Sequence, residues 1–490
     1  MSPDPRPNKA ALLTGLNDIL PAAAILTDRE SLRPYECDGL SAYRQLPLLT
    51  VLPDRIEQVQ AILQLCSQLG VAVVARGAGT GLSGGALPDA GGILLSLARF
   101  QDILEIDPER RIARVQPGVR NLAISDAAAP HGLYYAPDPS SQIACTIGGN
   151  VAENSGGVHC LKYGLTVHNI LALKVLTIEG ELLELGTGGL DAPGFDLLAL
   201  MTGSEGLLGV IVEVTVRLLP TPERRQVLLA AFDDIAQAAE AVGQIISAGI
   251  IPAGLEMMDH MAIKAAEDFI HAGYPTDAAA ILLCELDGTN AEVSEHVLQV
   301  REILLGNQAI SVRTANDEAE RARLWAGRKA AFPAIGRLAP DYYCMDGTIP
   351  RHELARILTA ITELSEEYGL AVANVFHAGD GNLHPLILYD ANRPGELKRA
   401  ELMGGRILEL CVSAGGAITG EHGVGMEKLD QMCVQFQQAE LAQFHAIKDA
   451  FDPNGLLNPG KAVPTLHRCA ELGAMHVHGG ALPFPEIERF

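Results

Sequence analysis

Apolar residues recur along the first 222 residues at either the helical or the strand period, and the elements that they predict are short. A helical spacing over residues 54–69 stops at Gly70, which is typical of a helix end. The same spacing predicts a surface helix over residues 10–26 and a second helix over 121–129. β-Branched and apolar runs predict strands near residues 46, 71, 93, 103 and 112, a hairpin over 170–185 with its turn at Glu179-Gly180, and a strand over 210–218.

The sequence Pro220-Thr221-Pro222 interrupts this pattern, and longer elements follow it. Strand-like runs near residues 227, 254, 280, 311, 342 and 371 alternate with helical spacings, which are clearest over 291–305 and 352–368. This alternation predicts an α+β fold with helices on one side of a mostly antiparallel sheet. We therefore expect a domain over 1–222, a second over 223–424, a helical segment over 425–463 and a tail over 464–490.

Composition and charge exclude several classes of protein. The chain has 490 residues, and its 60 acidic against 36 basic residues give a net charge of −24, which disfavours non-specific binding to nucleic acid. No apolar run approaches the ~20 residues that span a bilayer, so any membrane association would be peripheral and through partners. The nine cysteines are scattered without a Cys-x-x-Cys pair, which predicts reduced cysteines, a cytoplasmic protein and no iron–sulfur site in this chain.

The stretch Arg76-Gly77-Ala78-Gly79-Thr80-Gly81-Leu82-Ser83-Gly84-Gly85 follows a predicted strand. Glycines let backbone N–H groups approach an anion closely, and Arg76 adds a cation, so a pyrophosphate is the expected ligand. The stretch lacks the Gly-x-x-x-x-Gly-Lys pattern of nucleotide triphosphate loops and the following helix of the Rossmann fingerprint. A flexible glycine loop without a ligand is the alternative. A second glycine-rich stretch over 146–157 favours the ligand, because two such stretches, both flanked by strand-like runs, can form opposite walls of one groove.

Together with residues 137–141 and Thr202-Gly203-Ser204-Glu205-Gly206, the two stretches resemble the FAD-binding domain of the vanillyl-alcohol oxidase / p-cresol methylhydroxylase type. The resemblance implies FAD, held non-covalently because the first loop has no histidine to bond the flavin. The FAD-binding residues that it implies are Arg76, Gly77, Ala78, Gly79, Thr80, Gly81, Ser83, Gly84, Gly85, Pro139, Ser141, Thr146, Gly148, Gly149, Asn150, Ala152, Asn154, Gly156, Gly157, Glu205, Gly206, Gly209, Ile211 and Asn458.

The segment His377-Ala378-Gly379-Asp380-Gly381-Asn382-Leu383-His384 and the downstream Glu421-His422 form the second candidate site. Imidazoles and a carboxylate are the ligands of many catalytic metal sites. Gly379 and Gly381 disfavour a helix, so we expect the two histidines of the segment on a strand–turn–strand. A lone histidine usually has no such role, but three histidines and an acid between glycines favour a site.

These two segments resemble the signatures of flavin-dependent D-2-hydroxyacid dehydrogenases. Within that family, the flavin subunits of bacterial glycolate oxidases are the most similar, because they also resemble this sequence at residues 34–41, 255–259 and 466–471. The resemblance implies a divalent metal, zinc in the first instance, bound by His377, His384 and Glu421. It also implies His422 as the base, Arg328 as the residue that binds the substrate carboxylate, and glycolate as the small 2-hydroxy acid. The expected partners are a companion flavin-fold subunit and an iron–sulfur subunit at the cytoplasmic face of the membrane. The tail could dock them or could pack on this chain.

Three alternatives remain at this point. A D-lactate dehydrogenase would share every residue named above. A non-catalytic flavin-fold assembly subunit would have no use for the histidines and the acid, and an amino-sugar reductase would share only the FAD fold. For Arg328, the alternative is a solvated charge on a helix.

Overall fold

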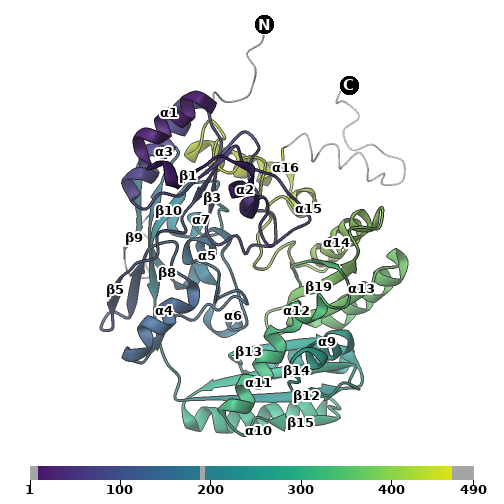
Figure 1. Cartoon of the computed structure of the whole chain (residues 1–490). Helices are drawn as coiled ribbons and strands as arrows, with labels where there is room; N and C mark the ends of the chain where they lie inside the picture. Colours follow the sequence, from purple (N-terminus) through teal and green to yellow (C-terminus); the bar gives the residue numbers. More distant parts are fainter. Residues whose placement is uncertain (1–8, 188–193, 466–468, 470–490) are drawn as a thin grey trace.

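The structure is a computed structural model that describes residues 9–187, 194–465 and Cys469 (Figure 1). We call residues 9–220 the N-terminal part, residues 224–413 the central part and residues 414–465 the C-terminal segment. Figure 1 shows the N-terminal part, in purple and blue, above the central part, in teal and green, with the yellow C-terminal segment returning to the N-terminal part. Most of the tail, for which partner docking is one expectation, lies outside the described residues.

The N-terminal part contains two principal sheets. The first has the order β1-β2-β4-β3, with parallel pairing of β2, β4 and β3, and its strands are β1 (Ile25–Leu26), β2 (Leu49–Val51), β3 (Val73–Arg76) and β4 (Ile93–Ser96). The second is antiparallel with the order β5-β6-β10-β8-β9, and its strands are β5 (Ile103–Asp107), β6 (Ile112–Val115), β8 (Ile170–Leu176), β9 (Leu182–Gly186) and β10 (Val210–Arg217). A small pair joins β7 (Leu133–Tyr134) to β11 (Leu219–Pro220).

The helices of the N-terminal part cover these sheets. They are α1 (Lys9–Ile19), α2 (Arg29–Leu32), α3 (Ile56–Leu69), α4 (Asn121–Ala128), α5 (Ile147–Glu153), α6 (Cys160–Tyr163) and α7 (Leu197–Met201), with 3₁₀ turns over Ala22–Ala24, Arg33–Tyr35, Ala129–His131 and Thr166–Asn169. The predicted end of α3 is confirmed, because Gly70 caps it in the left-handed conformation with φ +64°.

One prediction for the N-terminal part is wrong in its extent. The helix predicted over 10–26 ends at Ile19, since Pro21 cannot donate a helical hydrogen bond and Ile25 pairs with Val51. It is the predicted surface element, since Lys9, Thr14 and Asn17 are exposed, and its inner face buries Leu12 and Leu16 in the core. The second glycine-rich stretch contains helix α5, which the sequence pattern did not predict. Its Gly148 packs so closely on Pro117 that a Cβ there would lie 2.6 Å from the Pro117 Cβ.

The central part is one eight-stranded antiparallel sheet with the order β15-β12-β14-β13-β18-β19-β16, and β17 also pairs with β19. The strands are β12 (Arg224–Phe232), β13 (Gly254–Asp259), β14 (Ala280–Gly288), β15 (Ser311–Thr314), β16 (Asp341–Cys344), β17 (Gly347–Thr348), β18 (Val372–His377) and β19 (Asn382–Tyr389). The predicted α+β class and antiparallel sheet are confirmed, as is the strand–turn–strand between His377 and His384.

Helices cover both faces of this sheet, so the prediction of helices on one side is wrong. One face packs on α8 (Ile235–Ser247), α10 (Asn290–Gly306), α13 (Leu354–Tyr368) and α14 (Glu396–Ser413), and η5 (Arg351–Glu353) precedes α13. The other face packs on α9 (His260–Ile270), α11 (Glu318–Lys329) and α12 (Ala331–Ile335). Strand β14 begins with the sequence Ala-Ile-Leu-Leu-Cys, and such continuous apolar runs are typical of strands that are buried on both faces.

The C-terminal segment, with α15 (Leu429–Gln435) and α16 (Gln438–Phe451), completes the N-terminal part. Leu457 pairs with Val73 of β3 in parallel, and the Asn458 side chain donates to the backbone oxygens of Gly85 and Glu205. The segment therefore closes one side of the first glycine-rich stretch.

The cysteines were expected to be reduced, and this expectation is wrong for one pair. Cys433 on α15 forms a disulfide with Cys469, 36 positions later in the sequence, whereas the other cysteines are free and mostly buried. Among the described helices, none is long and apolar enough to cross a bilayer.

Candidate active site

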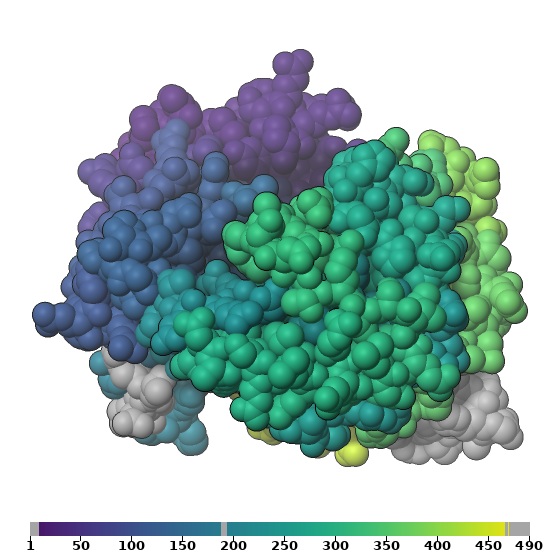
Figure 2. All heavy atoms as spheres, turned by 90° about the horizontal axis from the view of Figure 1, so that it is seen from below, coloured from purple at the N-terminus to yellow at the C-terminus, as the bar shows by residue number. Residues whose placement is uncertain are grey.

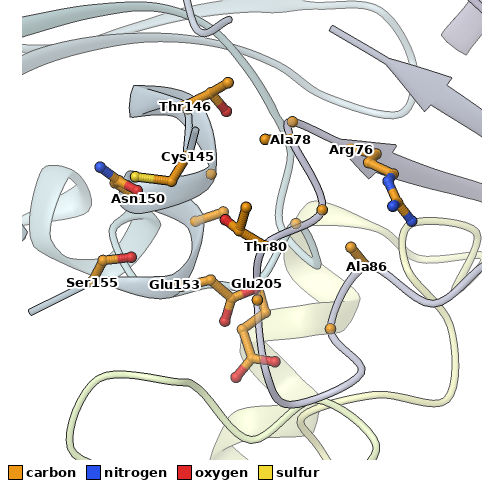
Figure 3. A pocket seen from close by; sticks show the side chains of 18 of the residues that line it. Arg76, Ala78, Thr80, Ala86, Cys145, Thr146, Asn150, Glu153, Ser155 and Glu205 are labelled. Carbon is orange, nitrogen blue, oxygen red and sulfur yellow. The ribbon is translucent and has the colours of Figure 1, made fainter. Parts of the chain in front are cut away.

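A cleft of about 1240 Å³ lies between the loop that follows β3 and helix α5. Figure 3 shows Arg76, Ala78 and Thr80 of the loop on one side and Cys145, Thr146 and Asn150 on the other. The carboxylates of Glu153 and Glu205 lie together at one end of this view. The two glycine-rich stretches thus form facing walls, as predicted.

The glycines of the first wall are required by their surroundings. Gly79 has φ +70°, and a Cβ there would lie 2.2 Å from the Arg76 guanidinium. A Cβ at Gly77 would lie 2.2 Å from the Thr146 hydroxyl of the opposite wall. Side chains at either position would therefore narrow the cleft.

Polar atoms in the cleft wall lack partners among the described residues. The Thr146 hydroxyl and the Asn150 side-chain amide are buried without a hydrogen bond. Buried polar groups are nearly always satisfied, so these atoms await a ligand or water. Unpaired donors next to a glycine-lined wall fit a large polar cofactor such as FAD.

The imidazole cluster lies where this cleft meets a second cavity of about 850 Å³. Residues Leu82, Ser140, Ser141, Glu421 and His422 line both cavities. The second cavity is further lined by Asp138, Val158, Arg328, Lys329, Phe332, Pro333, His377 and His384. Figure 2 shows the surfaces of the N-terminal part, in blue, and the central part, in green, side by side.

Glu421 is the centre of the cluster. Its Oε1 lies 3.0 Å from His384 Nε2, 3.4 Å from His377 Nε2 and 4.0 Å from His422 Nε2. The His384 and His422 rings stack at 5.0 Å. Ligand atoms of His377, His384 and Glu421 all lie within 4.8 Å of one another, as do those of Cys344, His384 and His422. The donors of the first set converge as a divalent cation requires.

Asp346 holds the turn that carries Glu421 and His422. Its Oδ2 accepts hydrogen bonds from the backbone N–H of His422 at 2.8 Å and of Gly420 at 3.1 Å, and from the Thr419 hydroxyl at 2.6 Å. Burial would raise the pKa of the Asp346 carboxyl, but Lys428 and the neighbouring histidines hold it well below its ordinary value. An ionised Asp346 therefore fixes the positions of both site residues.

His422 is neutral near pH 7 in these surroundings. Burial lowers its pKa to about 4, and His384 contributes in the same direction, against the attraction of Asp346. Its Nδ1 is buried without a hydrogen-bond partner among the described residues. A neutral imidazole with a free nitrogen at the junction of two cavities can accept a proton.

Arg328 is not the solvated helix charge of the alternative interpretation. Its side chain is only 3% exposed, and its Nε donates to Glu256 Oε2 at 2.8 Å. It lines the second cavity beside His377 and His384, so a cation is available to an anion bound there.

Comparisons with known proteins agree with this geometry. Residues 47–186 match the family model "FAD binding domain", and residues 221–462 match "FAD linked oxidases, C-terminal domain". The chain is 66% identical to glycolate oxidase subunit GlcD of Escherichia coli K12, over 99% of this chain and 97% of that protein. The chain belongs to the FAD-linked oxidases. The resemblance stated from its motifs is therefore confirmed, and residues 47–186 lie in a FAD-binding domain.

The more distant relatives of this FAD-linked oxidase include both a glycolate oxidase subunit and a D-lactate dehydrogenase. Glycolate oxidase subunit GlcD of Bacillus subtilis is 40% identical, over 87% of this chain and 91% of that protein. A D-lactate dehydrogenase of Anaerostipes hadrus is 32% identical, over 92% of this chain and 96% of that protein. Among solved structures, p-cresol methylhydroxylase has a TM-score of 0.80 at 19% identity, over 94% of this chain and 97% of that one, which shows the predicted fold.

Most of the residues predicted to hold the FAD line the cleft of this FAD-linked oxidase. The exceptions, which do not line it, are Ser83, Gly84, Asn154, Gly156, Gly157 and Asn458. Gly156 instead contacts the candidate metal-ligand cluster of His377, His384 and Glu421, since a Cβ there would lie 2.6 Å from Glu421 Oε2. The motifs did not reveal Glu153, Glu256 or Asp346 as parts of the two sites. An acidic residue within an apolar run, such as Glu256, is the signal that could have found them.

Proposed function

We propose that this FAD-linked oxidase oxidises glycolate and related small D-2-hydroxy acids to the corresponding 2-oxo acids. The observation that supports this most is that Glu421 and His422 line both the glycine-walled cleft and the cavity of Arg328. A substrate in that cavity would therefore lie between an anion-binding arginine, a neutral histidine and the cleft. The names of the relatives suggest glycolate and D-lactate as the acids.

FAD would occupy the cleft without a covalent bond, with the backbone of residues 76–85 and 146–150 around its polar portions. The proposal also keeps a domain boundary after residue 222, because the family model for the second domain begins at 221 and the central sheet begins at Arg224.

His377, His384 and Glu421 would hold a divalent metal, and zinc suits their nitrogen and oxygen donors. The pKa of the Glu421 carboxyl is held well below its ordinary value by its hydrogen bonds to His377 and His384, against the effect of burial. It is therefore an anionic ligand at neutral pH.

When bound, the metal supplies a Lewis acid for the substrate hydroxyl, and FAD supplies the acceptor for the hydride from the α-carbon. Arg328 would pair with the substrate carboxylate and orient the molecule. His422 would take the hydroxyl proton, since its imidazole is neutral. His377 and His384 are buried, and the Glu421 and His422 side chains are 12% and 11% exposed, so the cluster has limited contact with bulk water.

The electrons would leave through partner subunits. Two relatives are named as subunits of glycolate oxidase, which indicates an assembly. Within the described residues, the groups of side chains that could bind a metal include a single cysteine, Cys344, which is unlike an iron–sulfur site. We propose an iron–sulfur subunit and a companion flavin-fold subunit as partners, with the assembly at the cytoplasmic face of the membrane.

The first experiment mixes the purified chain anaerobically with glycolate, D-lactate, L-lactate or D-2-hydroxyglutarate and follows the visible flavin absorbance. Fastest bleaching with glycolate is the expected result. Fastest bleaching with D-lactate would favour the D-lactate dehydrogenase alternative. No bleaching with any acid, despite bound FAD and in the presence of the partner subunits, would favour the non-catalytic assembly subunit.

The metal is tested with His384→Ala. This variant is expected to keep the FAD spectrum but to lose bound zinc and substrate-driven bleaching. A variant that bleaches at the normal rate would contradict the metal assignment.

A further inference from the structure

The carboxylate of Glu256 joins the metal-ligand cluster to the arginine of the anion site. Glu256 lies on β13, and its side chain is 1% exposed. Its Oε1 accepts a hydrogen bond from His377 Nδ1 at 2.8 Å, and its Oε2 accepts one from Arg328 Nε at 2.8 Å. His377 lies on β18, Glu256 on β13 and Arg328 on α11, so this carboxylate connects two neighbouring strands of the central sheet to a helix that packs on one face of it.

On one side, Glu256 determines which nitrogen of His377 is free. A carboxylate only accepts hydrogen bonds, so Nδ1 must carry its proton. When this histidine is neutral, the lone pair is then on Nε2, which is the atom that faces Glu421 at 3.4 Å. Partners of this kind orient a metal-binding imidazole and raise its basicity.

On the other side, Glu256 determines which edge of Arg328 is free. Oε2 lies 2.8 Å from Nε and 2.6 Å from Nη2, so it occupies the Nε edge of the guanidinium. Nη2 makes no well-aligned hydrogen bond within the described residues. Nη2 is itself buried beside Oε2, so Nη1 is the terminal amino group left for an anion in the second cavity, which Arg328 lines.

We propose that Glu256 is a positioning residue that couples the metal site to the anion site. The inference rests on the proposed function, because it assigns Glu256 to that same site. One carboxylate sets the ring orientation of His377 and the free edge of Arg328, so its removal weakens zinc binding and substrate binding together. A residue with a purely structural role would lower stability without this paired effect.

The chain offers a matched control in Glu285. It lies on the neighbouring strand β14, its side chain is also 1% exposed, and it likewise contacts an arginine and a histidine, Arg321 at 3.0 Å and His159 at 3.3 Å. Neither partner belongs to the metal-ligand cluster. Glu285→Gln therefore removes an equivalent buried charge at a different place.

The experiment measures zinc affinity by chelator competition on FAD-loaded protein without substrate, and kcat and KM for glycolate separately. Glu256→Gln is expected to weaken zinc binding about 10- to 100-fold and to raise KM at saturating zinc. Glu285→Gln is expected to leave the zinc affinity within about twofold of wild type, which is small on the scale of such ligand-supporting contacts.

If Glu256→Gln does not fold, as judged by its FAD spectrum, Glu256→Asp takes its place. Weaker zinc binding is expected for this variant too, because the shorter side chain cannot reach both partners.

Three results would overturn the inference, in whole or in part, and they can be told apart. Equal zinc affinity in wild type and a folded Glu256 variant contradicts the positioning role and leaves the proposed function intact. A wild-type protein that binds no zinc contradicts the proposed metal site itself, and the inference with it. Weaker zinc binding with an unchanged KM contradicts the coupling to Arg328.

Discussion

Lys428 Nζ lies 3.1 Å from Asp346 Oδ2, and both side chains are completely buried. Lys428 also donates to the Gly423 carbonyl and to the Thr419 hydroxyl, at the two ends of the turn that carries Glu421 and His422. The ion pair therefore lies directly behind the proposed metal ligand and base.

Lys428→Met is expected to destabilise the protein by about 3–5 kcal/mol, because it leaves the Asp346 charge buried without its cation. The turn should also lose its fixed position, so zinc affinity should fall. Chemical denaturation and chelator competition measure the two effects. The double variant Lys428→Met, Asp346→Asn serves as the control, since it removes both charges and should regain part of the stability. A single variant with wild-type stability would contradict this account.

The contact between His159 and two carboxylates predicts a pH dependence of stability. His159 Nδ1 lies 2.8 Å from Asp138 and Nε2 lies 3.3 Å from Glu285, so the N-terminal and central parts meet at this residue. Burial opposes its charge, but Asp138 and Glu285 raise the pKa of His159 to about 10. A raised pKa in the folded state means that the stabilisation is complete below the ordinary value of 6.5 and is lost as the pH rises through about 10.

The midpoint of thermal unfolding should therefore be higher in wild type than in His159→Gln at pH 6. The shift should be about 2 to 4 °C for each kcal/mol of unfolding free energy that the charged His159 contributes. This difference should shrink between pH 7 and 10. Comparison with the variant at each pH removes the general effect of alkali. A difference that stays constant up to pH 10 would show that the charge of His159 is not involved.

Gly79→Ala should weaken FAD binding while the fold persists. The left-handed conformation costs an alanine about 1–2 kcal/mol, and the new Cβ would displace the Arg76 guanidinium, which is 2.2 Å away. We expect FAD affinity to fall about tenfold or more, since 1.4 kcal/mol corresponds to a factor of ten. Fluorescence titration of the apoprotein with FAD measures this. Tight binding in the variant would place the cofactor away from this wall.

Gly156→Ala should disturb the metal site from the opposite side. The new methyl group would lie 2.6 Å from Glu421 Oε2, so the carboxylate must move. We expect zinc affinity to fall about tenfold, as for other changes that shift a ligand, with FAD binding little changed. Gly243→Ala is the matched control, because it lies in α8 with no atom within 4 Å of its Cβ position. That control should stabilise the protein by up to about 1 kcal/mol.

The sequence predicted the groups that meet in the candidate site better than it predicted what holds them. His377 and His384 were expected on a strand–turn–strand. Glu421, which lies 37 positions after His384, was expected to join them, because glycines on both sides of each motif indicated a site, and it does contact His384. Glu256 could not be assigned in this way. Its partners lie 72 and 121 positions away, and a single acid in an apolar strand does not show which cation will reach it.

The same limit explains the errors in the fold. Local periodicity identified α3, α4 and the hairpin of β8 and β9, since each depends on neighbouring residues. It could not show that helices would cover both faces of the central sheet, because coverage depends on packing between distant segments. The apolar run Ala280–Cys284 at the start of β14 was the available sign.

The pairing of Leu457 with Val73 has a consequence for biosynthesis. Val73 lies in the first sixth of the chain and Leu457 in the last tenth, and the backbone of Val73 bonds to both Leu456 and Asn458. A ribosome that has released only the first 222 residues has therefore produced a sheet with an open edge beside the glycine loop. That edge closes only when translation is almost complete. The cleft, which Glu421 and His422 also line, is therefore completed only at the end of synthesis, and a prematurely terminated chain would leave an exposed strand edge of the kind that promotes aggregation.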